Sequence, residues 1–335
     1  MSYLGRRFTN FKRGLFQKIF GFHPYYPNHR VKMESEYPEI FNKEGRTLKV
    51  FFISDLEFAH APYQGVGKYI LWDRYNYALK THFYSHDEAF RPVGKPDRRF
   101  AFLCESRSIK PETYVRFLKA KKYLESEYDL VFSYDSEVLD TLNNARFVPF
   151  CAGFWYGKYK KDVNLSEQNY KNKSRSISIL SSSKTKSWAN VLRKSLAQKC
   201  KRSGLADTFG TFDGGTWVAP EVTLEHYRYS IIIENDITPF FFTEKLTNCF
   251  AAQVIPIYLG ATQIHRFFNP DGLITLTLED VDRIEDVLKQ CTPQEYERRL
   301  PAIIDNFQRV QEFKNPIDYM YDKHLRKYYE PGVAI

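Results

Sequence analysis

The sequence has no apolar run of about 18 residues, the length that a membrane-spanning helix needs. Its strongest apolar stretches, residues 230–233 and 254–259, are short and end in polar or turn residues. Residues 1–30 also lack the continuous apolar core of a secretory signal, because their apolar residues are spaced along the segment. We therefore expect a cytoplasmic protein without a signal peptide or a transmembrane helix.

Cysteine is scarce, with five residues among 335, and no two cysteines have CxxC spacing. Such an odd, scattered set favours reduced thiols over a disulfide framework or a zinc site. Metal motifs are lacking too, since the histidines show no ligand spacing. The one Asp-x-Asp, formed by Asp280 and Asp282, lies at a predicted helix start, where capping is the expected role. The sequence therefore predicts no metal and no required cofactor.

Acidic residues are missing where basic residues gather. Residues 1–30 hold six Lys and Arg and no acid, and residues 158–202 hold thirteen Lys and Arg but two acids. The net charge of +9 therefore comes from two local blocks, and we interpret them as two separate sites. A basic, aromatic-rich chain can bind nucleic acid, but no recognisable binding motif is present. We expect no nucleic-acid partner.

The first basic block has the pattern of an amphipathic helix. Phe8, Phe11, Leu15 and Ile19 recur at spacings of three and four, with basic residues beside them. Such a helix can pack on the body of the protein. Alternatively, residues 1–22 can hold the protein peripherally on an anionic membrane surface. The pattern leaves both interpretations open.

From residue 48 onward, short apolar runs alternate with longer helical segments. Strands are predicted at 48–54, 99–105, 129–135, 176–182, 207–210, 229–235, 254–260 and 273–276, and helices at 111–125, 187–199, 243–252 and 292–310. The strands are continuously apolar, as expected when helices cover both faces of a parallel sheet. A polar stretch at 156–175 separates two such series, which indicates an α/β fold with two doubly wound domains. Ligands of such folds bind where the strands end.

The segment that follows residues 229–233 carries the most chemistry. The predicted strand delivers Glu234 and Asn235 to its carboxyl end, and Thr243 stands where the next helix begins. Glu244 and Lys245 fall in the first turn of that helix, whose unpaired N–H groups suit a diphosphate. A capped surface helix with a solvated Glu–Lys pair has the same spacing. Spacing alone does not separate the two interpretations.

The elements Ile-Glu-Asn, Thr-Glu-Lys, Ile-Pro-Ile-Tyr-Leu-Gly and Phe-Asn-Pro follow in order between residues 229 and 274. Together they resemble the signature of the α-1,3-fucosyltransferases, glycosyltransferase family 10. The resemblance implies a GT-B fold, with two Rossmann-like domains facing a central cleft and the nucleotide held by the C-terminal one. It also implies an inverting transfer of fucose from GDP-fucose to a hydroxyl of a glycan acceptor, in protein glycosylation or lipopolysaccharide assembly.

Domain boundaries follow from the fold that the resemblance implies. We place a basic amphipathic segment at 1–30 and an acceptor-binding domain at 31–160. The donor-binding domain is placed at 161–310. Residues 311–335 form a tail that can pack back on the N-terminal domain.

The resemblance also assigns roles to single residues. Asn235, Glu244 and Lys245 match family positions that hold the nucleotide and its phosphates, with Glu234 and Thr243 beside them in the same elements. Phe241 stands where some members have Tyr, so a hydroxyl contact with the donor is missing.

One expected cation has no obvious counterpart. The family has an arginine early in the helix that follows the Ser-ending strand, and the aligned position here is Ala189. Lys184 or Lys186 supplies that charge, or both are solvated, and the sequence does not decide. A turn at Asp213-Gly-Gly lies near the donor side by the same resemblance.

Glu105 is the candidate catalytic base. It ends the predicted strand 99–105, and its Glu-Ser pair resembles an element of the family's N-terminal domain. An inverting transfer needs one carboxylate to take the proton from the attacking hydroxyl. A carboxylate that caps the next turn is the alternative. Asp55 and Asp135 follow two other strands and can orient the acceptor, although structural roles fit them better.

Other functions stay open beside this one. A GT-B transferase for a different GDP-sugar keeps the same diphosphate residues and differs in its sugar pocket, with surface polysaccharide assembly as its setting. A basic nucleic-acid-binding protein and a carbohydrate-binding protein without catalysis are the non-enzyme alternatives. His226 and His265 lie near the site segments, where core or surface roles fit them.

Overall fold

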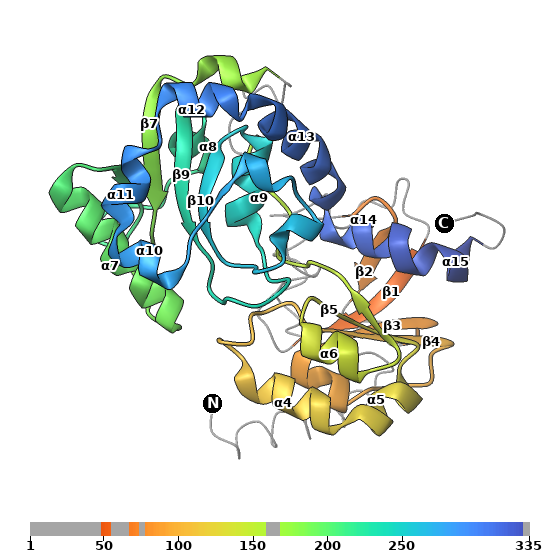
Figure 1. Cartoon of the computed structure of the whole chain (residues 1–335). Helices are drawn as coiled ribbons and strands as arrows, with labels where there is room; N and C mark the ends of the chain where they lie inside the picture. The colour runs from red at the N-terminus through yellow and green to blue at the C-terminus, as the bar shows by residue number, and fades with distance from the viewer. Residues whose placement is uncertain (1–47, 55–66, 74–77, 159–167, 331–335) are drawn as a thin grey trace. The chain divides into compact units, whose positions relative to one another are not determined.

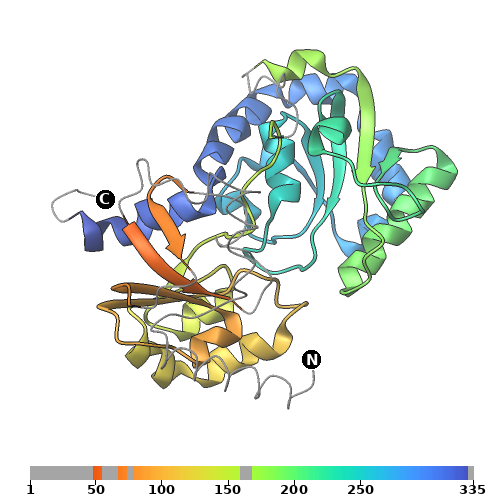
Figure 2. The same cartoon turned by 180° about the vertical axis from the view of Figure 1, so that it is seen from behind.

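The computed structural model describes residues 48–54, 67–73, 78–158 and 168–330, which form two units, each built on one parallel sheet (Figures 1 and 2). Unit 1 contains the described residues up to 104, then 112–148 and those from 317 onward. Unit 2 contains residues 105–111 and 149–316. Our predicted boundaries lie at 160/161 and 310/311. The predicted helix within residues 1–30 lies outside the described residues.

The sheet of unit 1 has six described strands in the order β2-β1-β3-β4-β5-β6, and all neighbours are parallel. The strands are β1 (Leu48–Ile53), β2 (Ile70–Asp73), β3 (Thr81–Ser85), β4 (Arg98–Phe102), β5 (Leu130–Ser133) and β6 (Ala145–Phe147). The strand order reverses at β1, which has β2 on one side and β3 on the other. Aromatic side chains fill the layers beside this sheet; Phe52, for example, stacks on Phe102.

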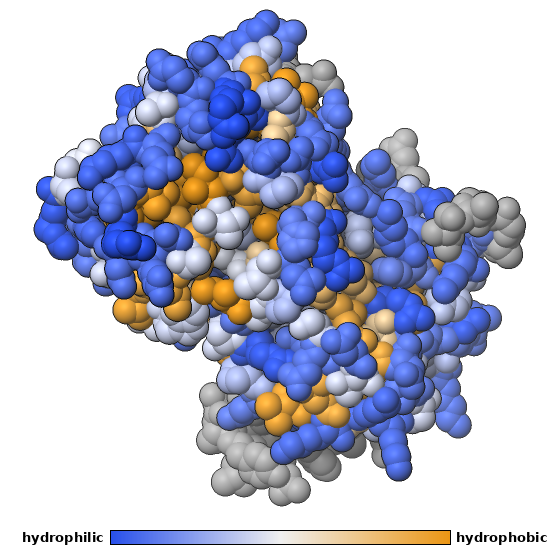
Figure 3. Space-filling model, in the orientation of Figure 1, coloured by the Kyte–Doolittle hydropathy of each residue, from blue (hydrophilic) through white to orange (hydrophobic). Residues whose placement is uncertain are grey.

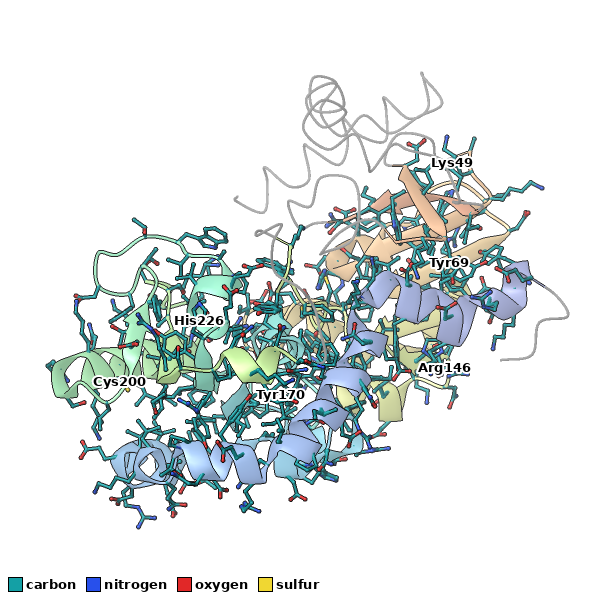
Figure 4. All side chains as sticks on the ribbon, turned by 90° about the horizontal axis from the view of Figure 1, so that it is seen from above. Lys49, Tyr69, Arg146, Tyr170, Cys200 and His226 are labelled. Atoms are coloured by element: carbon teal, nitrogen blue, oxygen red, sulfur yellow. The ribbon has the colours of Figure 1, made fainter. Side chains whose placement is uncertain are left out.

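Helices cover both faces of this sheet. The helices between strands are η1 (His86–Phe90), α4 (Pro111–Lys119), α5 (Lys121–Glu127) and α6 (Ser136–Thr141). The other face receives the last described helices, α14 (Pro316–Met320), the π-helix η6 (Tyr321–Leu325) and α15 (Arg326–Tyr329). Tyr69, labelled in Figure 4, stacks on Tyr321 at 4.4 Å between ring centroids, and the Arg326 guanidinium lies over the Tyr69 ring. The His324 ring also makes a hydrogen bond with the Phe147 carbonyl.

The sheet of unit 2 has five described strands in the order β11-β10-β9-β7-β8, again all parallel. The strands are β7 (Arg175–Leu180), β8 (Asp207–Phe209), β9 (Tyr227–Ile233), β10 (Ile255–Leu259) and β11 (Ile274–Thr275). The order reverses at β7, which lies between β8 and β9. The register pairs Ile179 with Ile231, and the Ser178 hydroxyl donates to the Ser230 hydroxyl across the same two strands at 3.0 Å.

Figures 1 and 2 show α7 with α10 and α11 on one side of this sheet and α8 with α9 on the other. The α-helices of unit 2 are α7 (Trp188–Ser203), α8 (Pro220–Leu224), α9 (Glu244–Ala251), α10 (Leu278–Asp282), α11 (Ile284–Lys289), α12 (Pro293–Arg298) and α13 (Leu300–Val310). Its short 3-10 helices are η2 (Asn169–Asn172), η3 (Ile264–Arg266), η4 (Pro270–Gly272) and η5 (Gln311–Phe313). Helices on both faces explain why β9 and β10 are buried throughout except at Arg228. Figure 3 shows apolar residues on the visible face of this unit, surrounded by hydrophilic residues.

Two predicted helices are each divided in the structure. The segment 111–125 divides at Ala120 into α4 and α5. The segment 292–310 divides at Arg299 into α12 and α13, because Pro301 in the first turn of α13 has no N–H to continue the earlier helix. No helix in the described part of the chain is long and apolar enough to cross a membrane.

Candidate functional site

The carboxyl ends of β7 and β9 mark the place in unit 2 where the strand order reverses. In open parallel sheets, connections from two such strands leave in opposite directions and open a crevice that binds ligands. The residues that follow β9 are Glu234, Asn235 and Asp236, and the helix that follows β7 is α7. The predicted donor-site segment therefore lies at the switch point of its sheet.

Glu234 is the centre of this site and is fully buried. Its Oε1 accepts a hydrogen bond from the Thr243 backbone N–H at 2.8 Å, and its Oε2 accepts from the Thr243 hydroxyl at 2.8 Å. The Lys245 ammonium donates to the same Oε2 at 3.2 Å. Gly260 makes room for this carboxylate, because a Cβ there would lie 2.7 Å from the Glu234 side chain and 2.3 Å from the Tyr258 hydroxyl oxygen.

Lys245 lies between two carboxylates. Its Nζ is 3.2 Å from Glu234 Oε2 and 3.4 Å from Glu244 Oε1. The Lys245 side chain is 23% exposed. Burial favours the neutral amine, but the charges of Glu234 and Glu244 outweigh it and raise the pKa of Lys245. The lysine is therefore a cation at neutral pH, and its position is fixed before any ligand arrives.

The N–H groups at the start of α9 are already paired, which differs from our expectation of an open anion cradle. Thr243 caps the helix, with its hydroxyl accepting from the Lys245 N–H at 3.3 Å. The Glu244 N–H donates to the Cys151 carbonyl at 2.7 Å, and the Leu246 N–H to the Thr243 carbonyl. The buried Glu234 in turn takes the Thr243 N–H, so none of these four N–H groups is left for a ligand. A negative ligand at this site therefore meets the side chains rather than the helix backbone.

A second cation lies on the other side of the switch point. Arg193, in the second turn of α7, is 6% exposed and donates to the Ile233 carbonyl at 2.6 Å. Its other terminal nitrogen is 3.4 Å from Asn235 Oδ1, which also accepts from the Asn190 amide at 2.9 Å. Burial lowers the pKa of Arg193, while the charge of Glu234 opposes that shift. The Arg193 guanidinium therefore links the helix that follows β7 to the loop that follows β9.

Our sequence comparison missed Arg193 because it examined the aligned position, Ala189. The two residues are four positions apart on α7, so their side chains lie on one face of the helix, one turn apart. Periodicity of the helix was the signal that could have found it. Lys184 and Lys186, the proposed substitutes, are exposed in the loop before α7.

The loop that holds these lysines packs against residues 210–211, which precede the predicted turn at 213–215. Gly210 has φ +99°, and a Cβ there would lie 2.2 Å from the Ser181 carbonyl oxygen. The Ser183 N–H donates to the Thr211 hydroxyl at 3.0 Å. Asp213 itself binds Lys201 of α7 at 2.6 Å, and that ion pair lowers the pKa of Asp213.

Glu105 lies in a strap of seven residues, Glu105 to Pro111, that belongs to unit 2 although the chain before and after it belongs to unit 1. From the sequence we placed Glu105 in the N-terminal domain, residues 31–160, whereas its contacts assign it to unit 2. Glu105 is half-buried, and its Oε1 accepts from the Ser106 N–H at 2.8 Å. Ser108 binds the donor-side loop twice: its N–H donates to Asp236 Oδ2 at 3.0 Å and its hydroxyl to the Asn235 carbonyl at 2.9 Å.

The remaining candidates lie apart from this group or are buried. Phe241 is 2% exposed. Asp135 caps α6 by accepting from the Val138 N–H at 3.0 Å, and Asp280 forms a capping box with Thr277 at the start of α10. Both capping roles agree with the sequence interpretation.

His226, His265 and Asp55 are the other residues that we named from the sequence. His226 (Figure 4) precedes β9 at the amino end of the strand, opposite to Glu234, and its ring lies 3.3 Å from the Asn172 carbonyl. His265 is exposed in η3. Asp55 lies outside the described residues. In the described part of the chain, no three His, Cys, Asp or Glu side chains form a group that could hold a metal ion.

No family model matches the chain, and no curated protein matches its sequence. Solved structures do match it. Anabaena Alr3699/HepE in complex with UDP and glucose has a TM-score of 0.50 at 10% identity, over 74% of this chain and 78% of the other. An α1,3-fucosyltransferase with GDP has a TM-score of 0.48 at 14% identity, over 81% and 90%. A trehalose-6-phosphate synthase has a TM-score of 0.48 at 10% identity, over 74% and 73%. The similarity to the first of these and the two parallel sheets confirm the predicted GT-B-like fold.

Proposed function

We propose that the chain is an inverting glycosyltransferase that moves fucose from GDP-fucose to a hydroxyl group of a glycan. One observation carries the proposal: Glu234, Thr243 and Lys245 of the family-like segment form one hydrogen-bonded group at the switch point of unit 2, and the neighbouring Asn235 binds Arg193 of α7. The switch point thus holds two cations, Lys245 within that group and Arg193 beside Asn235. A nucleoside diphosphate is the ligand class whose charge matches two fixed cations at such a crevice.

Each residue has a role in holding the donor. Lys245 and Arg193 neutralise the diphosphate, and Asn235 keeps the Arg193 guanidinium in place through its Oδ1. Glu244, 18% exposed beside Lys245, accepts hydrogen bonds from the ribose hydroxyls. Glu234 is too deeply buried to meet the donor and fixes Thr243 and Lys245 instead. These cations supply the charge that the transfer needs, so we propose no cofactor.

Glu105 acts as the general base. The acceptor oxygen forms a bond with the anomeric carbon while the bond from that carbon to the diphosphate breaks, and the electron pair leaves with GDP. The proton of the acceptor hydroxyl passes to the Glu105 carboxylate. Lys245 and Arg193 stabilise the negative charge that develops on the leaving diphosphate.

Phe241 favours a second candidate, a transferase for a GDP-sugar other than GDP-fucose. Its ring is 2% exposed and offers no hydroxyl where some fucosyltransferases have Tyr. The diphosphate contacts are the same in both candidates, so only the sugar pocket separates them.

The test combines binding with turnover. Calorimetry with GDP, UDP and duplex DNA should show binding of GDP, and a panel of GDP-sugars with glycan acceptors should show transfer from GDP-fucose. Glu105→Gln keeps the shape of the side chain but removes the base, so transfer should fall by about a thousandfold or more while GDP binding persists. Binding of DNA without GDP, or full transfer by E105Q, would contradict the proposal.

A further inference from the structure

We infer that Asp236 is a positioning residue for transfer, which holds the strap that carries Glu105 against the donor site. This inference rests on the proposed function, because it assigns Glu105 to the base. It starts from a contact between residues 128 positions apart in the sequence, the hydrogen bond from the Ser108 N–H to Asp236 Oδ2. Neither Asp236 nor Ser108 belongs to the family-like motif residues.

The Asp236 carboxylate connects two backbones. Its Oδ1 accepts from the Ile237 N–H at 3.1 Å, which fixes the carboxylate on its own loop. Its Oδ2 accepts from the Ser108 N–H at 3.0 Å. Asp236 is 9% exposed, so water competes little for these oxygens. Hydrogen bonds to a charged acceptor are stronger than neutral ones, so this carboxylate holds the strap firmly.

The attachment reaches Glu105 within three residues. The Ser108 hydroxyl adds a second bond, to the Asn235 carbonyl at 2.9 Å. Asn235 is the residue that binds Arg193, so the strap is joined to the donor-binding group itself. Toward the other end, the Ser106 N–H donates to Glu105 Oε1 and orients the carboxylate. The contacts therefore run from the donor group through Asp236 to Ser108, whose hydroxyl oxygen lies 3.3 Å from that of Ser106, the residue beside the base.

The strap also explains how base and donor keep a fixed geometry. Residues 105–111 belong to unit 2, as do Asn235, Asp236 and Lys245. A base carried by the donor-binding unit keeps its distance from the donor even when unit 1 moves. Because misplacing a catalytic group by about 1 Å can reduce a rate a hundredfold, loss of the attachment should act on turnover rather than on donor binding.

The experiment measures kcat, KM for GDP-fucose and the Kd of GDP for full-length variants. Asp236→Ala should lower kcat by about 10- to 100-fold, while the Kd of GDP stays within about threefold. Asp236→Asn keeps one acceptor oxygen and should lose less. Asp280→Ala is the matched control, since it removes a carboxylate that also accepts a backbone N–H, at the exposed start of α10. Its kcat should equal that of the unchanged protein.

A double variant separates positioning from general damage. In the E105Q background, D236A should reduce transfer no further, because a strap that positions a missing base has nothing left to position. Multiplicative losses, a Kd of GDP that weakens in step with kcat, or an unchanged kcat in D236A would each overturn the inference. Failure of the proposed function looks different, because the unchanged protein would then neither bind GDP nor transfer a sugar.

Discussion

At the switch point of unit 1, the residues after β1 and at the end of β3 are Ser54 and Ser85, two buried hydroxyls that bind each other. At the switch point of unit 2, Ser181 follows β7 and Glu234 follows β9, with Lys245 and Arg193 around the carboxylate. The two sheets share one strand order around this point. Topology therefore gives each unit a crevice, and the side chains decide what each crevice can hold.

In unit 1, the described residues directly at the same edge are Ser54, Ser85 and His86, none of which is an acid, a lysine or an arginine. His86 begins η1 with a left-handed backbone (φ +49°), and its Nε2 accepts from the Cys104 N–H at 3.3 Å. Hydroxyls and a histidine suit an uncharged ligand rich in hydroxyl groups better than a diphosphate. The difference teaches that charge, rather than fold, separates the switch point of unit 2 from that of unit 1, and it can be tested at single residues.

The largest expected effect comes from the charged pair of unit 2. Lys245→Met leaves the buried Glu234 without its cation, so the free energy of unfolding should fall by about 2–4 kcal/mol and the Kd of GDP should rise by about 10- to 100-fold. Adding Glu234→Gln should recover much of the stability but none of the GDP affinity. Denaturant titration and calorimetry check the two quantities. A double variant that also regains GDP binding would show that Lys245 serves the fold alone.

A second lysine of unit 2 sharpens the comparison between charged and neutral surroundings. Lys173 is 6% exposed and donates to the Leu224 and Glu225 carbonyls rather than to a carboxylate. Burial lowers the pKa of Lys173 to about 7, with the charge of Glu225 opposing the shift.

This lysine makes stability depend on pH with a predictable sign. As the pH falls below the unfolded pKa, the unfolded chain takes up a proton that the folded protein still refuses, so folding stability rises with pH from about 7 to about 10. Compared with Lys173→Met, the unfolding free energy of the unchanged protein should gain about 2 kcal/mol between pH 7 and pH 9. The buried thiols Cys200 and Cys291, whose pKa values are raised, change stability with pH in the opposite direction. Both proteins contain these thiols, so the difference between their unfolding free energies removes that contribution. Parallel curves for both proteins would refute the assignment.

The smallest effect is expected at the neutral edge of unit 1. Ser85→Ala removes the bond to Ser54 and should lower the free energy of unfolding by about 1 kcal/mol. The Kd of GDP should not change, since the hydroxyl pair belongs to the other unit. A tenfold weaker GDP affinity in S85A would break the separation between the two crevices.

The sequence sufficed for strands whose residues are continuously apolar, such as β9 and β10. It did not suffice for β3, where Thr81 and His82 look like loop residues. The structure buries all of β3, because the His82 ring makes hydrogen bonds with the Tyr84 hydroxyl and the Leu79 carbonyl. Polar residues that pair locally can occupy a core strand, and hydropathy alone does not show that.

The residues of the candidate site also fall into those that the sequence could predict and those that it could not. Glu234, Thr243 and Lys245 come from one short stretch, so spacing and resemblance could bring them together. Arg193 could be predicted only by considering the whole face of the helix that contains Ala189, and not the aligned position alone. The contact of Ser108 with Asp236 joins two loops far apart in the sequence, and no local pattern encodes it.

The last described helices, α14 to α15, have a consequence for the synthesis of the protein. They cover a sheet face built more than 150 residues earlier, with Tyr328 against Phe100 and His324 against Phe132. Until residues 317–330 leave the ribosome, that aromatic face lacks these covering helices, whereas the described residues of unit 2 have all been made. Unit 1 begins first and is completed last, so a nascent chain of this protein exposes an aggregation-prone surface for most of its translation.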